Sequence, residues 1–306
     1  MAASYRLLSY RANTGARAAV ALGDDLYDAA QLTGQSRYAT MLDILADWPA
    51  AEPRLREAAA RGAGGAKALG TVERLAPILY PSAVYCAGAN YADHMLEMAA
   101  AAKSEPEPDP HTQGLGPWHF IKASRAIVAD GAVVKLPRYA RNIDWEVELA
   151  AVIGRPARDV SLARALDHVA GYTIANDVSA RDAGRRGPVK ESSPFKWDWT
   201  SHKSFDGSCP LGPWIVPASD IPDPQALGIK LWINDVPKQD SNTSKMIFTL
   251  AEQIAHLSTR MTLHPGDLIL TGTPAGVGAG RGEFLKPGDT ARLWIERIGT
   301  LTTRFE

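Results

Sequence analysis

The chain of 306 residues has only two cysteines, Cys86 and Cys209, and almost no net charge. Two cysteines cannot form a disulfide scaffold for a chain of this length, and they fit a reducing compartment such as the cytoplasm. A formal net charge of −1 offers no electrostatic footprint for nucleic acid or an anionic membrane. No apolar run is long enough to span a bilayer, and residues 1–15 lack the pattern of a signal peptide. We therefore expect a soluble cytoplasmic protein that binds neither nucleic acid nor membrane.

Turn residues and periodicity divide the chain into two parts. Residues 4–30 alternate in short runs between turn residues, which is typical of hairpins, and residues 41–50 and 54–61 have helical patterns. A glycine-rich break at residues 62–65 follows. The sequence thus predicts a small N-terminal domain, residues 1–72, and a larger second domain, residues 73–306.

The second domain is rich in strand patterns. Apolar runs separated by turn signals occur at residues 77–87, 133–136, 145–153, 170–176, 214–216, 229–234, 267–271 and 291–296. Helical patterns are shorter, chiefly at residues 162–166 and 249–257. The fold class that follows is α+β and β-rich, rather than a doubly wound parallel sheet.

A proline-rich insertion interrupts the domain at residues 105–117. Every second residue from Glu105 to Pro110 is proline, which excludes a helix there. Loops of this length inside a compact domain are usually functional lids or disordered segments, and both alternatives stay open.

Three carboxylates form the first chemical signal. Residues 143–154 have the pattern of a buried strand, and side chains alternate faces along a strand, so Glu146 and Glu148 project to the same side. Asp177 ends the apolar run 171–177. Together they can hold an octahedral Mg²⁺ or Mn²⁺, and zinc is disfavoured because no histidine or cysteine cluster accompanies them. The alternatives are a solvent-facing pair of glutamates and an aspartate that caps a turn.

An imidazole and a carboxylate form the second signal. Asn90 can cap a short helix, and His94 and Glu97 then lie three residues apart on one face. A carboxylate beside an imidazole orients it and raises its pKa, which suits a general base that activates water. The alternative is an ordinary surface pair.

Three further groups are candidates for contact with an anion. Lys203 lies in an otherwise weakly charged polar run and can neutralise an enolate or a carboxylate. Arg181 offers bidentate carboxylate binding. Thr273 lies in the glycine-rich turn of residues 270–278, which lacks the features of a phosphate loop or a dinucleotide fingerprint. Solvated loops and surface ion pairs are the alternatives.

Taken in order, these segments resemble the fumarylacetoacetate hydrolase family, in its acylpyruvate hydrolase branch. The matching motifs are GANYADHMLE (88–97), DWEVEL (144–149), GYTIANDVSARD (171–182), KSFD (203–206), NTSKMIF (242–248) and LTGTPAGVG (270–278). They extend over about residues 80–295, and six motifs in the family's order are a specific signal.

The resemblance implies a mixed β-roll catalytic domain behind a small N-terminal domain, usually in a homodimer. It implies Mg²⁺ or Mn²⁺ on Glu146, Glu148 and Asp177, and a water-activating dyad of His94 and Glu97. It further implies enolate stabilisation by Lys203 and contacts of Arg181, Thr273 and Tyr91 with a small-molecule keto acid. The reaction expected is hydrolysis of a carbon–carbon bond in an acylpyruvate-like or diketo-acid substrate.

The sequence also departs from the family pattern. Ala123 replaces a common proline, His202 stands where smaller residues are common, and the insertion at residues 105–117 is long. The insertion leaves open a substrate bulkier than a simple acylpyruvate. Decarboxylation of oxaloacetate or another β-keto acid, isomerisation of a keto acid, and a catalytically silent metabolite-binding role are the alternative functions.

Overall fold

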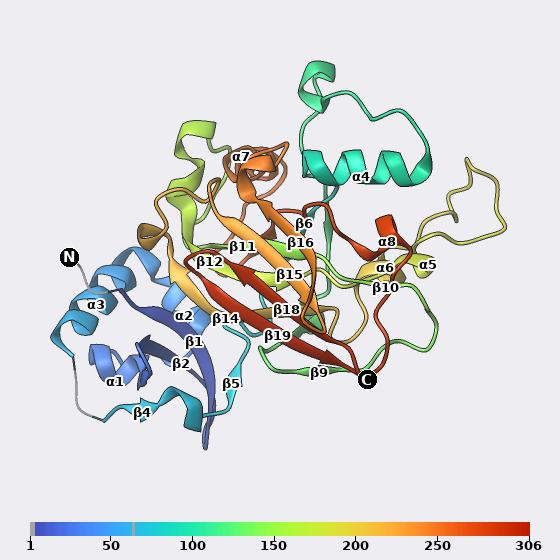
Figure 1. Cartoon of the computed structure of the whole chain (residues 1–306). Coiled ribbons are helices and arrows are strands. Elements are labelled where there is room, and N and C mark those ends of the chain that lie inside the picture. Colours follow the sequence, from blue (N-terminus) through green and yellow to red (C-terminus); the bar gives the residue numbers. More distant parts are fainter. Residues whose placement is uncertain (1–3, 63–64) are drawn as a thin grey trace.

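The protein has a β-rich α+β fold, as the sequence predicts. The computed structural model describes residues 4–62 and 65–306; of the predicted glycine-rich break, Ala63 and Gly64 lie outside them. Two sheets pack face to face, and short helices cover the outer surfaces (Figure 1). None of the helices described has the combination of length and apolar content that a membrane span requires.

The larger sheet runs through the whole molecule. Its order is β4 (Lys67–Ala68), β3 (Asp25–Asp28), β2 (Gly15–Leu22), β1 (Arg6–Ala12), β14 (Cys209–Pro217), β12 (Val169–Asn176), β11 (Val147–Ile153), β17 (Leu268–Leu270), β6 (Val84–Ala87) and β7 (His119–Ile121), with β5 (Arg74–Leu75) on β1 and β8 (Ile127–Val128) on β14. The second sheet has the order β16 (Val236–Asn242), β15 (Gly228–Ile233), β18 (Thr290–Ile295), β19 (Gly299–Phe305) and β9 (Val133–Val134). Two short strands, β10 (Ile143–Asp144) and β13 (Ser179–Ala180), form a separate pair.

The helices are short and lie at the ends and on the faces of the sheets. The α-helices are α1 (Ala29–Thr33), α2 (Met41–Ala46), α3 (Trp48–Arg61), α4 (Ala92–Ala102), α5 (Arg181–Gly184), α6 (Trp199–Lys203), α7 (Leu250–Arg260) and α8 (Gly278–Arg281). The 3-10 helices are η1 (Leu69–Thr71), η2 (Pro110–Gln113), η3 (Ser124–Ala126), η4 (Leu162–His168), η5 (Ala218–Asp220) and η6 (Thr243–Lys245).

Strand β11 is buried on both of its faces. Leu149 and Ala151 pack in the core between the two sheets, whereas Ala150 and Val152 pack in a second core beneath the N-terminal helices. This double burial explains why the segment is a continuous apolar run rather than an alternating one. Glu148 is two residues before Ala150, so it lies on the face of the second core.

The N-terminal strands continue the large sheet. Strand β1 pairs with β14 at Leu7 and Ile215, and the blue N-terminal elements therefore extend the sheet at one end (Figure 1). The boundary predicted near residue 72 thus falls within a continuous sheet, and the division into residues 1–72 and 73–306 stays a prediction.

Several predicted elements have other boundaries. One helix over residues 41–50 is wrong: α2 ends at Ala46 and α3 begins at Trp48, because Pro49 lies in the first turn of a new helix. Residues 162–166 form part of the 3-10 helix η4, and the strand predicted at 77–87 begins only at Val84. The strand predicted through residues 143–154 is broken between β10 and β11, so Glu146 lies immediately before β11.

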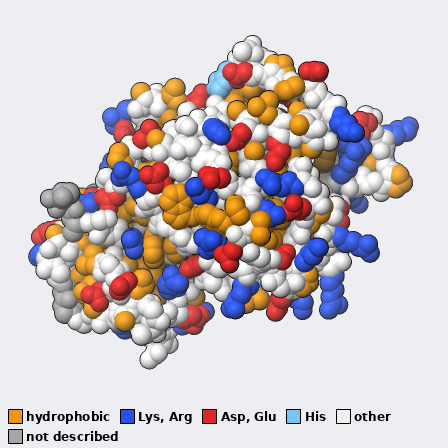
Figure 2. Space-filling model, in the orientation of Figure 1, with side chains coloured by type: hydrophobic (Ala, Val, Ile, Leu, Met, Phe, Trp, Pro, Cys, Tyr) orange, Lys and Arg blue, Asp and Glu red, His pale blue; other side chains and the backbone are white. Residues whose placement is uncertain are grey.

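Charged side chains of both signs are scattered over the surface. Figure 2 shows Lys and Arg side chains among Asp and Glu side chains on the face in view, with no field of one sign. This distribution agrees with the formal net charge of −1.

Strands β12 and β14 pack closely at Gly171, and this leads to a prediction about the stability of the protein. A Cβ atom there would lie 2.4 Å from the Val216 carbonyl oxygen and 2.6 Å from Ile215 Cγ2. Gly171→Ala should therefore lower the free energy of unfolding by about 1–3 kcal/mol, because the strands must separate to admit the methyl group. Urea denaturation measures this change. Gly70→Ala, where nothing lies within 4 Å, is the control; equal effects of the two substitutions would contradict the prediction.

Candidate active site

Two neighbouring strands bring the three predicted carboxylates together. Strands β11 and β12 are antiparallel and pair Val147 with Asn176, so the start of β11 lies beside the end of β12. Glu146 and Glu148 flank Val147, and Asp177 follows Asn176. One oxygen atom from each carboxylate lies within 4.8 Å of the others, and all three side chains are buried.

Cationic side chains surround these carboxylates. Lys203, the last residue of α6, places Nζ 2.9 Å from Glu146 Oε2 and 2.6 Å from Asp177 Oδ2. Lys122 Nζ lies 2.5 Å from Asp177 Oδ1. The guanidinium of Arg181 donates to Glu146 Oε1. The structure thus brings Lys203 and Arg181 to the predicted acidic group, and their predicted roles toward a substrate stay predictions.

Asp144 is a fourth buried carboxylate in the cluster. It accepts hydrogen bonds from Arg181 Nε at 2.8 Å and from the N–H groups of Gly278 and Ala279. Burial raises the pKa of this carboxyl, although the guanidinium of Arg181 opposes the shift. Asp144 therefore holds both Arg181 and the start of α8 in place.

The environment moves the pKa values of the two glutamates in opposite directions. Burial alone would raise the pKa of Glu146, but the charges of Lys203 and Arg181 lower it to about 2. Burial, followed by repulsion from Asp177 and Glu146, raises the pKa of Glu148 well above its usual value. The Gly272 N–H donates to Glu148 Oε2 at 2.7 Å but does not reverse this shift. Of the three carboxylates, Glu148 is the one without an ion pair to a lysine or arginine among the described residues.

The donor set fits a divalent cation. Three carboxylate oxygens at close range are the ligands that Mg²⁺ and Mn²⁺ prefer. When all are ionised, the four carboxylates of the cluster face three cationic side chains, which leaves an excess of one negative charge. A divalent cation would change this to an excess of one positive charge, which favours a keto-acid anion. It would also relieve the repulsion at Glu148.

His94 and Glu97 lie on one face of α4, as predicted. His94 Nδ1 is 3.7 Å from Glu97 Oε2, longer than a hydrogen bond, and has no hydrogen-bond partner among the described residues. The Gly276 N–H donates to both oxygens of Glu97, at 3.0 and 2.8 Å. Burial opposes ionisation of Glu97, but the imidazole and this N–H lower its pKa below the usual value.

The glycine-rich turn after β17 binds the protein's own carboxylates. Its N–H groups at Gly272, Gly276 and Gly278 donate to Glu148, Glu97 and Asp144 respectively. The Thr273 hydroxyl donates to the Val147 carbonyl and accepts from Gln239 Nε2. The backbone of the turn thus holds the carboxylates of Glu148, Glu97 and Asp144 in place.

A cavity of about 150 Å³ lies at the centre of this arrangement. The predicted residues Glu146, Glu148, Arg181, Lys203, His94 and Thr273 all line it. Three predicted residues do not line it: Asp177 and Glu97 contact the lining residues Lys203 and His94 from behind, at 2.6 and 3.7 Å. The Tyr91 side chain is fully buried, and its hydroxyl has no hydrogen-bond partner among the described residues. The structure therefore does not bring Tyr91 to the cavity, whose walls are completed by Ala87, Gly88, Ala89, Asn90, Trp118, Phe120, Trp199 and His202.

Four residues of the site escaped the sequence reasoning. Lys122 and Asp144 are buried ion-pair partners, and a charged residue within an apolar run was the only available signal. His202 lines the cavity with a pKa lowered to about 3 by burial and by the charges of Lys203 and Arg181. The capping role expected of Asn90 is wrong. Tyr91 precedes α4, and the Asn90 amide instead bonds the backbone of Phe248 and Thr271.

The family model of the fumarylacetoacetate (FAA) hydrolase C-terminal domain matches residues 83–306. This range includes every candidate site residue. The matched range contains all six motifs that suggested the family, and it extends beyond them to the end of the chain.

The relatives of this chain are named for different activities. The chain is 40% identical to the mitochondrial oxaloacetate tautomerase fahd2 of Xenopus laevis over 233 residues, 76% of this chain and 67% of the relative. It resembles the structure of maleylpyruvate hydrolase from Sphingobium sp. SYK-6 in complex with manganese(II) ion and pyruvate, with 29% identity, a TM-score of 0.74 and 98% of each chain covered. It also resembles 5-carboxymethyl-2-hydroxymuconate delta-isomerase from Mycobacterium smegmatis, with 32% identity, a TM-score of 0.71 and the same coverage.

The raised pKa of Glu148 predicts a pH-dependent affinity for metal. Its carboxyl keeps a proton at a pH where an ordinary glutamate has lost it, and a cation that uses this oxygen must displace that proton. The affinity for Mn²⁺ should therefore rise with pH by up to about tenfold per unit until Glu148 is ionised, and then become constant.

Calorimetric titration with Mn²⁺ in buffers of different ionisation enthalpy measures both the affinity and the protons released. Glu148→Gln should bind more weakly and without this pH dependence. Tight binding that releases no proton and does not vary with pH would contradict the prediction.

Proposed function

The chain belongs to the fumarylacetoacetate hydrolase family, and from this premise we propose that it hydrolyses a carbon–carbon bond in an acylpyruvate-like or diketo-acid substrate. One observation carries the proposal: His94 lines the same cavity as the carboxylates Glu146 and Glu148 and the ammonium of Lys203. The cavity therefore combines a base for water with positive charge for a departing enolate. This is the pairing that carbon–carbon hydrolysis needs.

A divalent cation, Mg²⁺ or Mn²⁺, would be held by Glu146, Glu148 and Asp177 and would supply Lewis-acid polarisation of the two oxygens of a 1,3-dicarbonyl group. The side chains around it have separate roles. Arg181 remains available at the cavity wall for the carboxylate of the keto acid, although two carboxylates of the protein already orient it.

His94 activates the attacking water in this proposal. Its Nδ1 faces Glu97, which leaves Nε2 to accept the proton of a water molecule. The hydroxide adds to the acyl carbonyl carbon, and the bond between this carbon and the neighbouring methylene breaks. The bonding electrons pass to the keto-acid fragment as an enolate, and the imidazolium returns the proton to give pyruvate and a carboxylic acid.

Lys203 stabilises the enolate. Its ammonium is buried, and although burial opposes the charge, the neighbouring Asp177 and Glu146 raise its pKa. The side chain therefore stays cationic throughout the reaction. A fixed positive charge in a small cavity lined by buried side chains stabilises a developing anion, because little water competes for it.

Tautomerisation of oxaloacetate is the second candidate. It is favoured by the 40% identity to a protein named as an oxaloacetate tautomerase, and a cavity of about 150 Å³ suits a small dicarboxylate. This reaction is an isomerisation of a keto acid, which is one of the alternative functions named in the sequence analysis. It requires proton transfer but no attacking water. None of the relatives described above is named as a decarboxylase.

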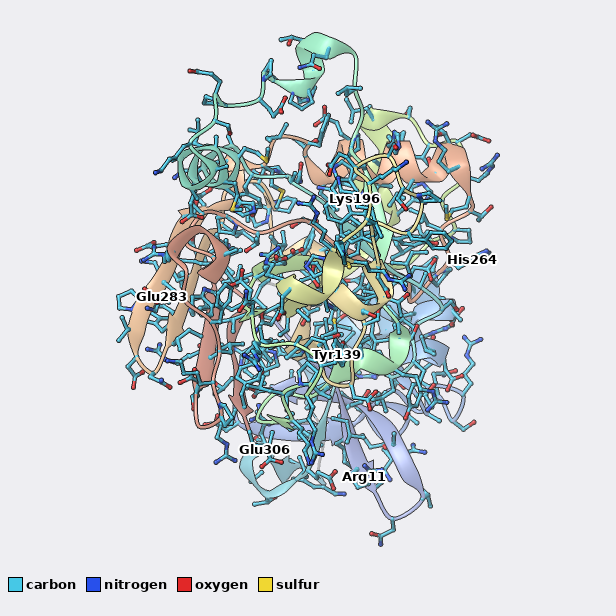
Figure 3. The ribbon with its side chains drawn as sticks, turned by 90° about the vertical axis from the view of Figure 1, so that its right-hand side faces the viewer. Arg11, Tyr139, Lys196, His264, Glu283 and Glu306 are labelled. Atoms are coloured by element: carbon cyan, nitrogen blue, oxygen red, sulfur yellow. The ribbon has the colours of Figure 1, made fainter. Side chains whose placement is uncertain are left out.

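His94→Ala should lower kcat for acylpyruvate hydrolysis by about 10²–10⁴-fold, because the base that activates water is lost. Affinity for Mn²⁺ should change little, because His94 is not one of the three carboxylate ligands. The measurement is pyruvate release together with calorimetric Mn²⁺ binding. His264→Ala is the matched control, since His264 is exposed at the periphery of the molecule (Figure 3).

A substrate panel separates the two candidates. Wild-type protein loaded with Mg²⁺ or Mn²⁺ should release pyruvate from acylpyruvates and diketo acids faster than it interconverts the keto and enol forms of oxaloacetate. If oxaloacetate is the better substrate and His94→Ala retains that activity, the hydrolase assignment is wrong and tautomerisation is the function. The predicted homodimer and cytoplasmic location do not depend on this outcome and stay predictions.

A further inference from the structure

The proline-rich insertion forms the roof of a second cavity. After α4 the chain loops away from the sheet and carries η2 before it returns (Figure 1). Beneath it lies a cavity of about 670 Å³, which we call the outer chamber; the 150 Å³ cavity is the inner chamber. The outer chamber is lined by Gly88, Ala89, Ala92, Met95, Leu96, Pro106, Glu107, Pro108, Asp109, Pro110, His111, Gln113, Leu115, Gly116, Trp118, Met246, Ile247 and Phe248.

The two chambers adjoin each other. Gly88, Ala89 and Trp118 line both of them. The Trp118 indole packs directly on Gly88, where a Cβ atom would come within 2.0 Å of the ring. Trp118 also packs edge-on against Trp199, with ring centroids 5.6 Å apart. The Trp118 side chain therefore lies at the boundary between the inner and the outer chamber.

Contacts with α7 and with Phe248, which lies just before α7, hold the insertion over the outer chamber. His111 Nε2 lies 3.1 Å from Glu252 Oε1, and Nδ1 lies 2.9 Å from Asp109 Oδ1. The same imidazole packs on Phe248, with centroids 4.6 Å apart. The segment predicted as a lid or as disordered is thus a folded cover in this structure.

Charge is divided unequally between the chambers. The inner chamber contains Arg181 and Lys203 together with Glu146 and Glu148. Among the described residues that line the outer chamber none is a lysine or an arginine, and the titratable ones are Glu107, Asp109 and His111, of which the last two contact each other. Most of the remaining wall is apolar, with Met95, Leu115 and Trp118 among its larger side chains. A carboxylate placed there would lose water and meet like charges, whereas a hydrocarbon group would gain by burial.

We propose that the outer chamber binds a neutral, apolar acyl tail of the keto-acid substrate while the keto-acid end occupies the inner chamber. This inference rests on the proposed hydrolase function and specifies its substrate class: acylpyruvates with an alkyl or aryl tail, rather than those that end in a second carboxylate. The chamber's volume lies in the range of about 300–1,000 Å³ that binds whole small molecules. A substrate as short as oxaloacetate would leave it empty.

A binding series tests the proposal without relying on turnover. Mn²⁺-loaded protein is titrated calorimetrically with pyruvate, 2-oxobutanoate, 2-oxohexanoate and 2-oxooctanoate, and with the dicarboxylate 2-oxosuberate. Affinity should rise about three- to fourfold for each methylene that passes Trp118, and 2-oxosuberate should bind at least about tenfold more weakly than 2-oxooctanoate. Affinities that do not depend on chain length, equal binding of the dicarboxylate, or no binding of any 2-oxo acid would overturn the proposal.

Two variants on α4 test whether the gain in affinity with chain length arises in the outer chamber. Ala92→Trp fills the outer chamber from its wall, so it should remove most of the gain in affinity between pyruvate and 2-oxooctanoate. Ala101→Trp makes the same substitution at an exposed position of the same helix outside the chamber lining. It should leave the gain intact. Equal gains in the two variants would contradict the proposal.

Hydrolysis assays separate this inference from the function on which it rests. Acetylpyruvate, hexanoylpyruvate, benzoylpyruvate and succinylpyruvate are compared by kcat/KM. If all are hydrolysed with no preference for neutral tails, the outer chamber assignment fails and the hydrolase function stands. If none is hydrolysed but the chain-length dependence of binding persists, the hydrolase function fails and the outer chamber assignment stands.

Discussion

The buried charge cluster where β11 begins and β12 ends is the constraint on which the site depends. Carboxylates taken out of water are tolerated only when they are paired, and here Lys122, Arg181 and Lys203 pair with all but one of them. The imbalance at Glu148 is one that a further cation would relieve. The same pairings fix the ends of two strands, the start of α5 and the end of α6, so that local structure and the candidate metal centre stabilise each other.

The glycine-rich turn connects this cluster to the dyad. Its N–H groups donate to Glu148, Glu97 and Asp144, which come from three different elements. A side chain at Gly276 would come within 2.0 Å of the Lys238 carbonyl oxygen, so the turn can approach the sheet only as glycine. One loop thereby sets the distance between α4, which contains His94 and Glu97, and the carboxylates at the strand ends.

The two chambers explain how a shared fold can serve different reactions. The inner chamber contains the charges, and chemistry with an enolate depends on it whether the enolate arises from hydrolysis or from tautomerisation. The outer chamber is built mainly from the insertion and α4, whereas the lysine, arginine and carboxylate side chains that line the inner chamber come from other elements. Relatives of this chain are named as tautomerase, hydrolase and isomerase, so the names within the family differ in reaction and substrate.

Local patterns were sufficient for the fold class, the family, the carboxylates and the positions of His94 and Glu97, because strand alternation and helical spacing depend on nearby residues alone. The pairing of Arg181 with Asp144 and of Lys122 with Asp177 joins residues 37 and 55 positions apart, and no local pattern encodes it. Burial of Tyr91, the amide contacts of Asn90 and the folding of the insertion over a cavity likewise depend on which distant segments pack together. Long-range packing therefore decided the charges, the accessibility and the shape of the site.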